Sequence, residues 1–159
     1  MLDHFVSMPP RLQWSPHALE VLRLANSSLR HFGHSHVSSV HLILGLLKLQ
    51  KGGGANVLRN AGVSVESVEG FLSSRSDSTE EMTLHNGIPL GESARMALDR
   101  AEVEARSLKH TYLTPVHLFL GVLMEETGGA ADLLASLHTD LDKMGQDALE
   151  FDGYGPPNT

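Results

Sequence analysis

The sequence predicts an all-α protein in which two four-helix repeats pack as one eight-helix globule with an approximate twofold axis. The first observation is a pair of apolar runs, Val-His-Leu-Ile-Leu-Gly-Leu-Leu at 40–47 and Val-His-Leu-Phe-Leu-Gly-Val-Leu at 116–123, offset by 76 residues. The second is that segments 15–72 and 91–148, aligned without a gap, share 15 identities in 58 positions. A fixed offset of this kind indicates an internal duplication. An all-apolar helix needs cover on every side, so we expect the two copies to pack against each other.

The first repeat is expected to span residues 14–72. Ser15 and Pro16 form a helix start, with Ser15 as the N-cap and Pro16 at the first helical position. An apolar stripe at helical spacing then continues to Phe32, and Gly33 ends the helix. The other expected boundaries are a cap at Ser38 or Ser39 for the second helix, a break at Gly52-Gly53-Gly54, a short third helix at 56–60 and a cap at Ser64 for the fourth.

The second repeat, at 90–150, restarts the same pattern after a polar segment. Residues 73–89 begin with a run of serines and acidic residues without an apolar stripe, so we expect them to be a linker. In the second repeat Asp140 stands where the first has the cap Ser64. We expect an irregular lead at 1–13 and a flexible tail at 151–159.

Composition narrows the class of protein. The chain has 159 residues, which favours a single domain, and it has no cysteine, which excludes disulfides and thiolate metal sites. Its formal charge of −7 repels a phosphate backbone on average, so we expect no nucleic-acid partner. The apolar runs are far shorter than the roughly 20 residues that span a bilayer, and no secretory signal is recognisable. We therefore expect a cytoplasmic protein without a membrane partner.

Four histidines fall within residues 31–41, a cluster that raises the question of a metal site. Zinc needs three or four ligands that converge from fixed elements. Two of these histidines recur in the second repeat, one just past a helix end and one in the first turn of the apolar helix, where an imidazole can bond nearby backbone groups. We therefore expect no metal and no other cofactor, and a structural role for the recurring residues His34, His41, His110, His117, Gly45 and Gly121.

Catalysis is not expected either. Ser38, Ser39 and His41 lie close in sequence, but they have the chemistry of an ordinary helix start. A hydrolase needs an activated nucleophile and an orienting acid, and the sequence contains no Gly-x-Ser-x-Gly elbow. We assign no catalytic residue.

The repeated segments resemble the Clp N-terminal domain (double Clp-N motif), the module at the front of Clp unfoldases such as ClpC and ClpA. The resemblance covers about residues 14–150 and rests on the same motifs in both halves. In the first half these are Trp14-Ser15-Pro16-His17-Ala18, Gly33-His34, the Ser39–Leu46 helix start and Gly52-Gly53-Gly54-Ala55. In the second half they are Leu90-Gly91-Glu92-Ser93-Ala94, Lys109-His110, the Pro115–Val122 helix start and Gly128-Gly129-Ala130-Ala131.

The chain departs from the family in two respects. It contains no Gly-x-x-x-x-Gly-Lys-Ser/Thr phosphate loop, so we expect no ATP hydrolysis, and a free-standing module and a fragment of a longer protein both stay open. The glutamate that precedes the family's histidine is Val40 in one copy and Val116 in the other. In ClpC-type modules these acidic residues help to hold the guanidinium of phosphoarginine-tagged substrates. Valine cannot pair with a cation, so phosphoarginine binding is disfavoured.

The resemblance implies a non-enzymatic protein-binding module that binds adaptors, protein substrates or the Clp ATPase and protease subunits, and so modulates Clp-dependent proteolysis. The alternative is a free-standing decoy or scaffold that sequesters ligands of a Clp unfoldase. Helix N-termini carry unpaired amides, and valine adds an apolar surface beside them. We therefore expect partner binding in the groove at the start of each second helix, at Ser39, Val40, Pro115 and Val116.

Overall fold

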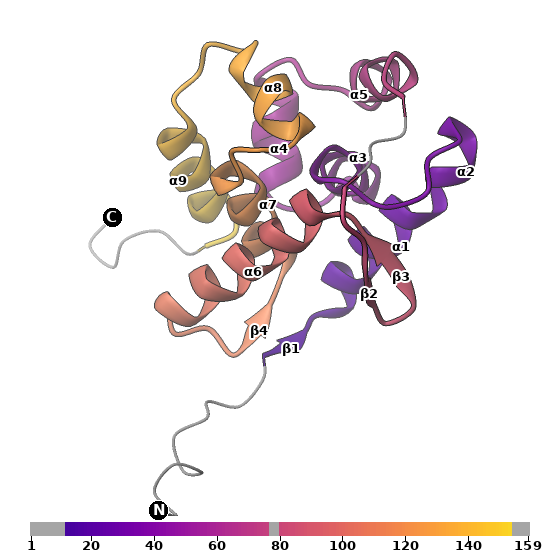
Figure 1. The fold of residues 1–159 in the computed structure, drawn as a ribbon. Helices are drawn as coiled ribbons and strands as arrows, with labels where there is room; N and C mark the ends of the chain where they lie inside the picture. Colours follow the sequence, from indigo (N-terminus) through magenta and orange to yellow (C-terminus); the bar gives the residue numbers. More distant parts are fainter. Residues whose placement is uncertain (1–11, 77–79, 154–159) are drawn as a thin grey trace, which may run out of the picture.

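The chain folds into two helical repeats, which the computed structural model describes over residues 12–76 and 80–153 (Figure 1). The all-α prediction is confirmed. Most of the expected lead and tail lies outside the described residues. The first repeat comprises β1 (Gln13–Trp14), α1 (Pro16–Ser27), α2 (Leu29–Phe32), α3 (Ser39–Leu49), α4 (Gly53–Asn60) and α5 (Val65–Ser73). A hairpin of β2 (Thr83–His85) and β3 (Ile88–Leu90) leads to the second, which comprises α6 (Glu92–Ser107), β4 (Tyr112–Leu113), α7 (Pro115–Met124), α8 (Gly129–Ala135) and α9 (Leu141–Phe151).

Capping residues set most helix boundaries. The Ser15 hydroxyl accepts a hydrogen bond from the Ala18 amide at 3.1 Å, and Gly33 ends α2 in the left-handed conformation with φ of 68°. Ser64 caps α5, and Asp140 caps α9 at the equivalent position. These predictions are confirmed.

Two boundaries differ from the expectation. The first predicted helix is interrupted at Ser28, whose buried hydroxyl donates to the Ala25 carbonyl at 2.7 Å, so that α1 and α2 are separate. The third helix begins at Gly53 rather than at residue 56. Only Gly52, with φ of 91°, serves as the expected break, because its conformation is one that residues with a side chain rarely adopt.

The central helices are the two apolar runs, α3 and α7. Ser39 to Leu47 and Val116 to Leu123 are buried without exception, because α1, α5 and α8 pack on α3 while α6, α8 and α9 pack on α7, and the two helices also touch each other. A Cβ at Gly45 would lie 2.5 Å from the carbonyl oxygen of Val21 in α1. The recurring glycine in each run therefore lets α1 approach α3 closely, and α6 approach α7.

The short helix that follows each central helix packs on the other repeat. Helix α4 lies against α9 and α7, and α8 lies against α3. A Cβ at Gly53 would lie 2.0 Å from the Ala148 carbonyl oxygen, and one at Gly129 would lie 2.8 Å from Cγ2 of Val40. The Gly-Gly pairs are therefore contact points between the repeats, and this exchange joins the two halves into one globule.

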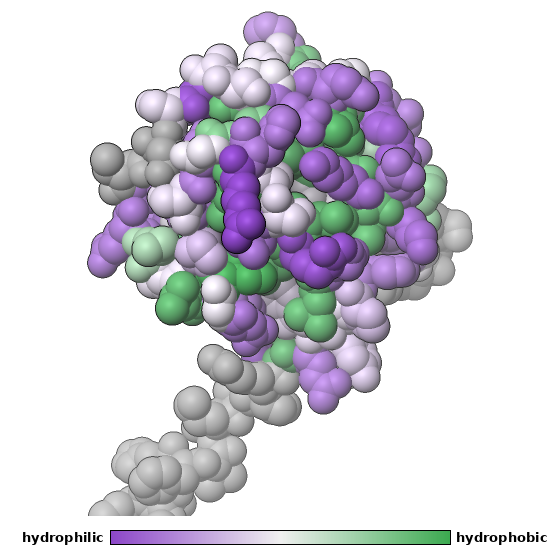
Figure 2. Space-filling model, turned by 90° about the vertical axis from the view of Figure 1, so that its right-hand side faces the viewer, coloured by the Kyte–Doolittle hydropathy of each residue, from purple (hydrophilic) through white to green (hydrophobic). Residues whose placement is uncertain are grey.

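Part of the expected linker is folded. Strands β2 and β3 pair antiparallel around a turn in which Asn86 and Gly87 both have positive φ, as a tight hairpin requires. Leu90 also forms a parallel bridge with Val37 of the first repeat. Polar and apolar residues are mixed on the side of the molecule that carries α5, α2 and this hairpin (Figure 2). The hairpin therefore ties the start of the second repeat to the first.

Candidate functional site

A crevice lies between the repeats at the start of α3. It has a volume of about 180 Å³ and is bordered by the first turn of α3, the chain that follows α5, and the starts of α6 and α8. We call it the α3 crevice. The lining residues that matter most here are His34, Val40, Leu72, Arg75, Gly129 and Asp132.

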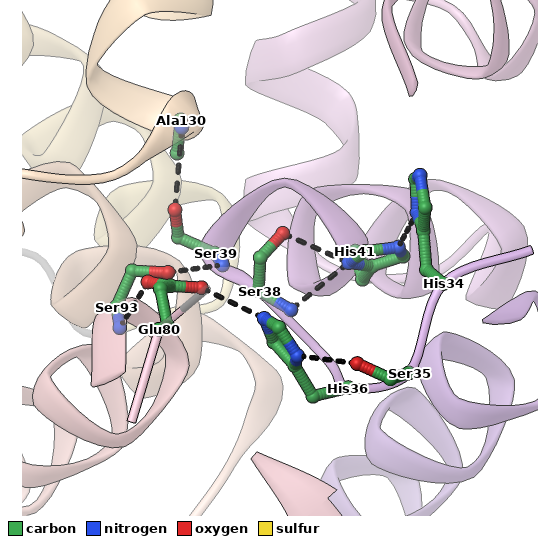
Figure 3. A network of polar contacts seen from close by, with 9 residues as sticks. All are labelled: His34, Ser35, His36, Ser38, Ser39, His41, Glu80, Ser93 and Ala130. Atoms are coloured by element: carbon green, nitrogen blue, oxygen red, sulfur yellow. Dashed lines mark hydrogen bonds and ion pairs between the residues drawn. The ribbon is translucent and has the colours of Figure 1, made fainter. Parts of the chain in front are cut away.

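Three helix starts converge on Ser39 beside this crevice (Figure 3). The Ser39 amide donates to the Ser93 hydroxyl of α6 at 3.1 Å, and the Ala130 amide of α8 donates to the Ser39 hydroxyl at 3.2 Å. Ser39 has no exposed surface, so both bonds are shielded from water. One small polar residue thus fixes the relative positions of α3, α6 and α8.

Glu80 fastens the chain between the repeats to the same place (Figure 3). One carboxylate oxygen accepts from the Ser93 amide at 2.9 Å, which caps the start of α6. The other lies 3.1 Å from Nε2 of the buried His36, whose Nδ1 lies 2.9 Å from the Ser35 hydroxyl. No sequence motif predicts this cluster, because His36 and Glu80 are 44 residues apart.

His34 and His41 form a hydrogen-bonded pair on the crevice wall (Figure 3). The Ser38 amide donates to Nδ1 of His41 at 2.9 Å, in the capping position where glutamate or glutamine is usual. Nε2 of His41 lies 2.9 Å from Nδ1 of His34, and Nε2 of His34 lies 3.2 Å from the Arg75 carbonyl oxygen. The sequence placed each histidine correctly at a helix end, but it did not show that the two rings meet.

The second repeat contains the same pair. The Thr114 amide donates to Nδ1 of His117 at 2.9 Å, and Nε2 of His117 lies 2.8 Å from Nδ1 of His110. Burial, with a smaller contribution from the charge of His110, lowers the pKa of His117 to about 4. His117 is therefore neutral at physiological pH, and its ring is part of the core.

Arg75 brings a positive charge to the crevice. Its guanidinium lies 4.8 Å from the centre of the Phe71 ring and 3.5 Å from the carboxylate of Asp132 in α8. The two charged side chains are 43% and 69% exposed. An ion pair this long and this exposed adds little stability, so an incoming anion can replace Asp132 at low cost.

A second cavity, of about 240 Å³, lies at the start of α7, and we call it the α7 crevice. Five of its lining residues are exactly one repeat offset of 76 from residues that line the α3 crevice. The pairs are His17 and Ser93, Lys51 and Thr127, Gly52 and Gly128, Thr114 and Ser38, and Asp152 and Ser76. The two cavities are thus equivalent positions of the duplicated fold.

The two crevices differ in the residues that pack beside them. Leu72 of α5 corresponds to Ala148 of α9, and the smaller alanine lets Gly53 pack directly on the α9 backbone. The Asp152 carboxylate then accepts a hydrogen bond from the Gly53 amide at 2.8 Å. Burial raises the pKa of Asp152, and the bond to Gly53 opposes that shift. A carboxylate thus stands at the α7 crevice where the α3 crevice has Ser76.

The four residues expected to bind partners are distributed unequally. Val40 is 2% exposed and forms part of the floor of the α3 crevice, and Ser39 lies beneath it. Pro115 is half-buried in the wall of the α7 crevice, whereas Val116 is 1% exposed inside the core. Sequence reasoning missed Arg75 and Asp132. Arg75 follows the first aligned segment, and Asp132 lies in the second but corresponds to Asn56, so neither belongs to a recurring motif.

Within residues 12–76 and 80–153, no three histidine or acidic side chains are placed to hold a metal ion together. The helices in the same part of the chain are also too short or too polar to cross a bilayer.

Comparison with known proteins gives the relatives of this chain. It is 29% identical over 141 residues to the Bacillus subtilis protein "Negative regulator of genetic competence ClpC/MecB", covering 89% of this chain and 17% of that protein. It is 33% identical over 131 residues to a Guillardia theta homologue of the Clp protease ATP-binding subunit ClpA, covering 80% and 15%. The chain therefore spans only about a sixth of the length of these relatives.

Solved structures share the fold. The N-terminal domain of the chaperone ClpD from Arabidopsis thaliana superposes with a TM-score of 0.70 at 20% identity, over 87% of this chain and 93% of that one. The N-domain of ClpV from Vibrio cholerae gives a TM-score of 0.61 at 18% identity, over 96% and 98%. The sequence model of the family described as "Clp repeat (R) N-terminal domain" matches residues 13–137 and 89–159. The duplicated helical fold and this match together show that the chain belongs to the Clp repeat N-terminal domain family.

Proposed function

We propose that this chain is a non-enzymatic protein-binding module that holds a segment of a substrate or adaptor in the α3 crevice for a Clp-type chaperone or protease. The observation that supports this most directly is that the α3 crevice, at the junction of the two repeats, is lined by both aliphatic side chains and the guanidinium-bearing Arg75. The relatives named above include an ATP-binding subunit of the Clp protease, which is consistent with a role in delivery.

The lining of the α3 crevice favours an aliphatic group next to a negative charge. Val40 and Leu72 supply apolar surface, and the guanidinium of Arg75 lies at the rim. The cavity volume fits about one side chain of a partner. A short peptide segment with an aliphatic side chain beside a carboxylate meets both requirements.

The guanidinium half of phosphoarginine is poorly matched by this lining, although its phosphate carries the negative charge that Arg75 attracts. Val40 and Val116 replace the acidic residues of the family, and both are buried among apolar groups. Of the carboxylates at the α3 crevice, Glu80 is engaged by the Ser93 amide and His36, and Asp132 is paired with Arg75. The cation at the rim is Arg75, and a ligand's carboxylate that replaces Asp132 would take over its pairing.

One series of polar contacts contains the three groups of a hydrolytic triad: the alcohol of Ser35, the imidazole of His36 and the carboxylate of Glu80. In a hydrolytic triad the alcohol meets Nε2 and the acid meets Nδ1, and here the order is reversed. Glu80 also caps α6, which is a structural task. The series is better explained as a fastening of the chain between the repeats.

A binding measurement tests the proposal. The probe is a hexapeptide that ends in leucine with a free carboxylate, compared at neutral pH with the same peptide as its C-terminal amide. We expect the acid form to bind more tightly, and Arg75→Gln to abolish that preference while the exposed control Arg59→Gln keeps it. Equal binding of both peptides, or equal effects of both substitutions, would overturn the assignment.

A second experiment separates delivery from sequestration. Affinity capture with this chain from the lysate of its own cell, followed by mass spectrometry, recovers Clp ATPase or protease subunits if the module takes part in delivery. Recovery of client proteins without any Clp subunit contradicts a role in delivery. It supports the alternative function, a decoy that sequesters ligands of a Clp unfoldase.

A further inference from the structure

A third cavity lies on the second repeat, where the end of α7, helix α8 and the start of α9 meet. It has a volume of about 210 Å³, and we call it the α8 cleft. Its apolar lining consists of Leu123, Ala131, Leu134, Ala135 and Leu141. None of the residues that line it also lines the α3 crevice, so the two are separate places on the molecule.

Two carboxylates also line the α8 cleft, and they differ in what they bind. Glu125 is buried, and its carboxylate accepts hydrogen bonds from the amides of Thr127 and Gly128 at 2.8 and 2.9 Å. Those amides lie at the start of α8, where the helix dipole offsets a negative charge. Glu126 is exposed and forms no ion pair with any residue in the described part of the chain. The cleft therefore offers an apolar surface beside one free carboxylate.

The sequence around the cleft adds negative charge. Leu141, which is 36% exposed, stands between the exposed residues Asp140 and Asp142. The lysine that follows them, Lys143, is paired with Asp147 at 3.2 Å. No lysine or arginine belongs to the lining of the cleft. The local charge therefore attracts a cationic partner and repels an anionic one.

The first repeat does not share this charge. The residues that stand one repeat offset of 76 before Glu126 and Ala135 are Gln50 and Arg59. At these positions the first repeat thus has a cation and no carboxylate, whereas the second has a carboxylate and no cation. The negative α8 cleft is therefore a feature of the second repeat and not of the duplicated fold.

We propose that the α8 cleft is a docking site for a protein partner that inserts one leucine-sized side chain flanked by lysine or arginine. The aliphatic side chain packs on Leu123, Leu134 and Leu141, since the cavity volume accommodates about one side chain. A flanking cation pairs with the free carboxylate of Glu126. The site goes beyond the proposed function, because its ligand is opposite in charge to the segment expected in the α3 crevice.

Amide NMR of the isotope-labelled whole chain tests the docking site. The probe is a hexapeptide with blocked ends and the central sequence Lys-Leu-Lys, compared with hexapeptides that carry Lys-Ala-Lys or Glu-Leu-Glu instead. We expect the Lys-Leu-Lys peptide to bind most tightly, with shifts that centre on Glu126, Ala135 and Leu141. Equal binding of the leucine and alanine peptides, or of the lysine and glutamate peptides, would overturn the proposal.

Two matched variants test the place of binding. Ala135→Arg introduces the residue of the first repeat into the cleft, and because Ala135 is exposed, the core is left intact. It is expected to abolish binding of the Lys-Leu-Lys peptide. Gln146→Arg adds the same charge at an exposed position of α9 outside the lining and is expected to retain most of the binding. Equal losses in the two variants would contradict docking in the cleft.

Two further variants separate this site from the α3 crevice. Glu126→Gln is expected to lower the affinity for the Lys-Leu-Lys peptide by a factor of about 2–5, as the loss of an exposed ion pair implies. Arg75→Gln is expected to leave that affinity unchanged, so the docking site and the proposed function can fail independently. An equal loss in Arg75→Gln contradicts a separate site. Peak positions that change with protein concentration without peptide would assign the cleft to a second copy of this chain and overturn the proposal.

Discussion

Gly53 rests directly on the backbone of Ala148, so closely that an added Cβ would lie 2.0 Å from the alanine carbonyl oxygen. In the other half the equivalent residues, Gly129 and Leu72, both line the α3 crevice, and a Cβ at Gly129 would meet Val40 and Arg75 instead. One difference in side-chain size therefore accompanies a difference in lining between the two equivalent crevices. We infer that this difference directs the partner to the α3 crevice.

The first prediction concerns the packing of α4 on α9. Gly53→Ala is expected to lower the free energy of unfolding by about 1–3 kcal/mol, because the methyl group can fit only if the helices separate. Urea denaturation measures the change. Gly70→Ala is the control, since a Cβ there meets no atom within 4 Å and alanine favours α5 by up to about 1 kcal/mol. Equal stabilities of the two variants would contradict the close contact.

The second prediction concerns the convergence of three helix starts. Ser93→Ala removes the acceptor of the buried Ser39 amide, which is expected to cost about 1–3 kcal/mol in the free energy of unfolding. The exposed Ser27 hydroxyl donates within its own helix, so Ser27→Ala is expected to change stability by no more than about 0.5 kcal/mol. If the two substitutions have the same effect on the urea midpoint, the Ser39 junction does not hold the repeats together.

The third prediction is a pH dependence of stability. His117 has a pKa of about 4 in the folded chain against 6.5 for an unperturbed histidine, so the unfolded chain takes up this proton first. The contribution of His117 to stability is present above pH 6.5 and is lost as the pH falls towards 4, by about 3 kcal/mol in total.

A titration-free variant isolates that contribution. His117→Gln keeps an acceptor for the Thr114 amide, as glutamine does in a capping box, and carries no ionisable group. Its stability is expected to depend less on pH than that of the unaltered chain between pH 7 and 4. Parallel stability curves for the two proteins would contradict the lowered pKa.

The fourth prediction concerns the ion pair at the rim of the α3 crevice. Asp132→Asn frees the Arg75 guanidinium from its partner, so the affinity for the leucine-carboxylate hexapeptide is expected to rise by a factor of about 2–5, as the loss of an exposed ion pair implies. Asp147→Asn is a control on α9, where the carboxylate pairs with Lys143. A rise of the same size in both variants would reflect net charge alone.

The sequence predicts the parts of this fold that depend on local chemistry and periodicity. The offset between the two apolar runs identifies the duplication, and Ser15, Gly33, Ser64 and Asp140 mark helix ends because capping involves only neighbouring residues. The hairpin also had a local signal, Asn86-Gly87, that the polar composition of the surrounding segment obscured.

Features that depend on contacts between residues distant in the sequence or on the packing of helices could not be predicted from the sequence. Glycine at 53 is typical of a helix break, and only the packed α9 explains why it lies inside α4. The pairing of His34 with His41 needs the angle between two helices, and the exposure of Val40 to a cavity needs the position of Leu72. The start of α3 was therefore identified from sequence, whereas the difference between the two halves was not.

The central claim is that the α3 crevice alone receives the partner. Titration of the isotope-labelled chain with the leucine-carboxylate hexapeptide, followed by amide NMR, tests it most directly. We expect the largest shifts at Val40, Leu72, Arg75 and Gly129, and small shifts around Thr114 and Gly53. Shifts that centre on the α7 crevice, or that divide equally between the two, would contradict the claim.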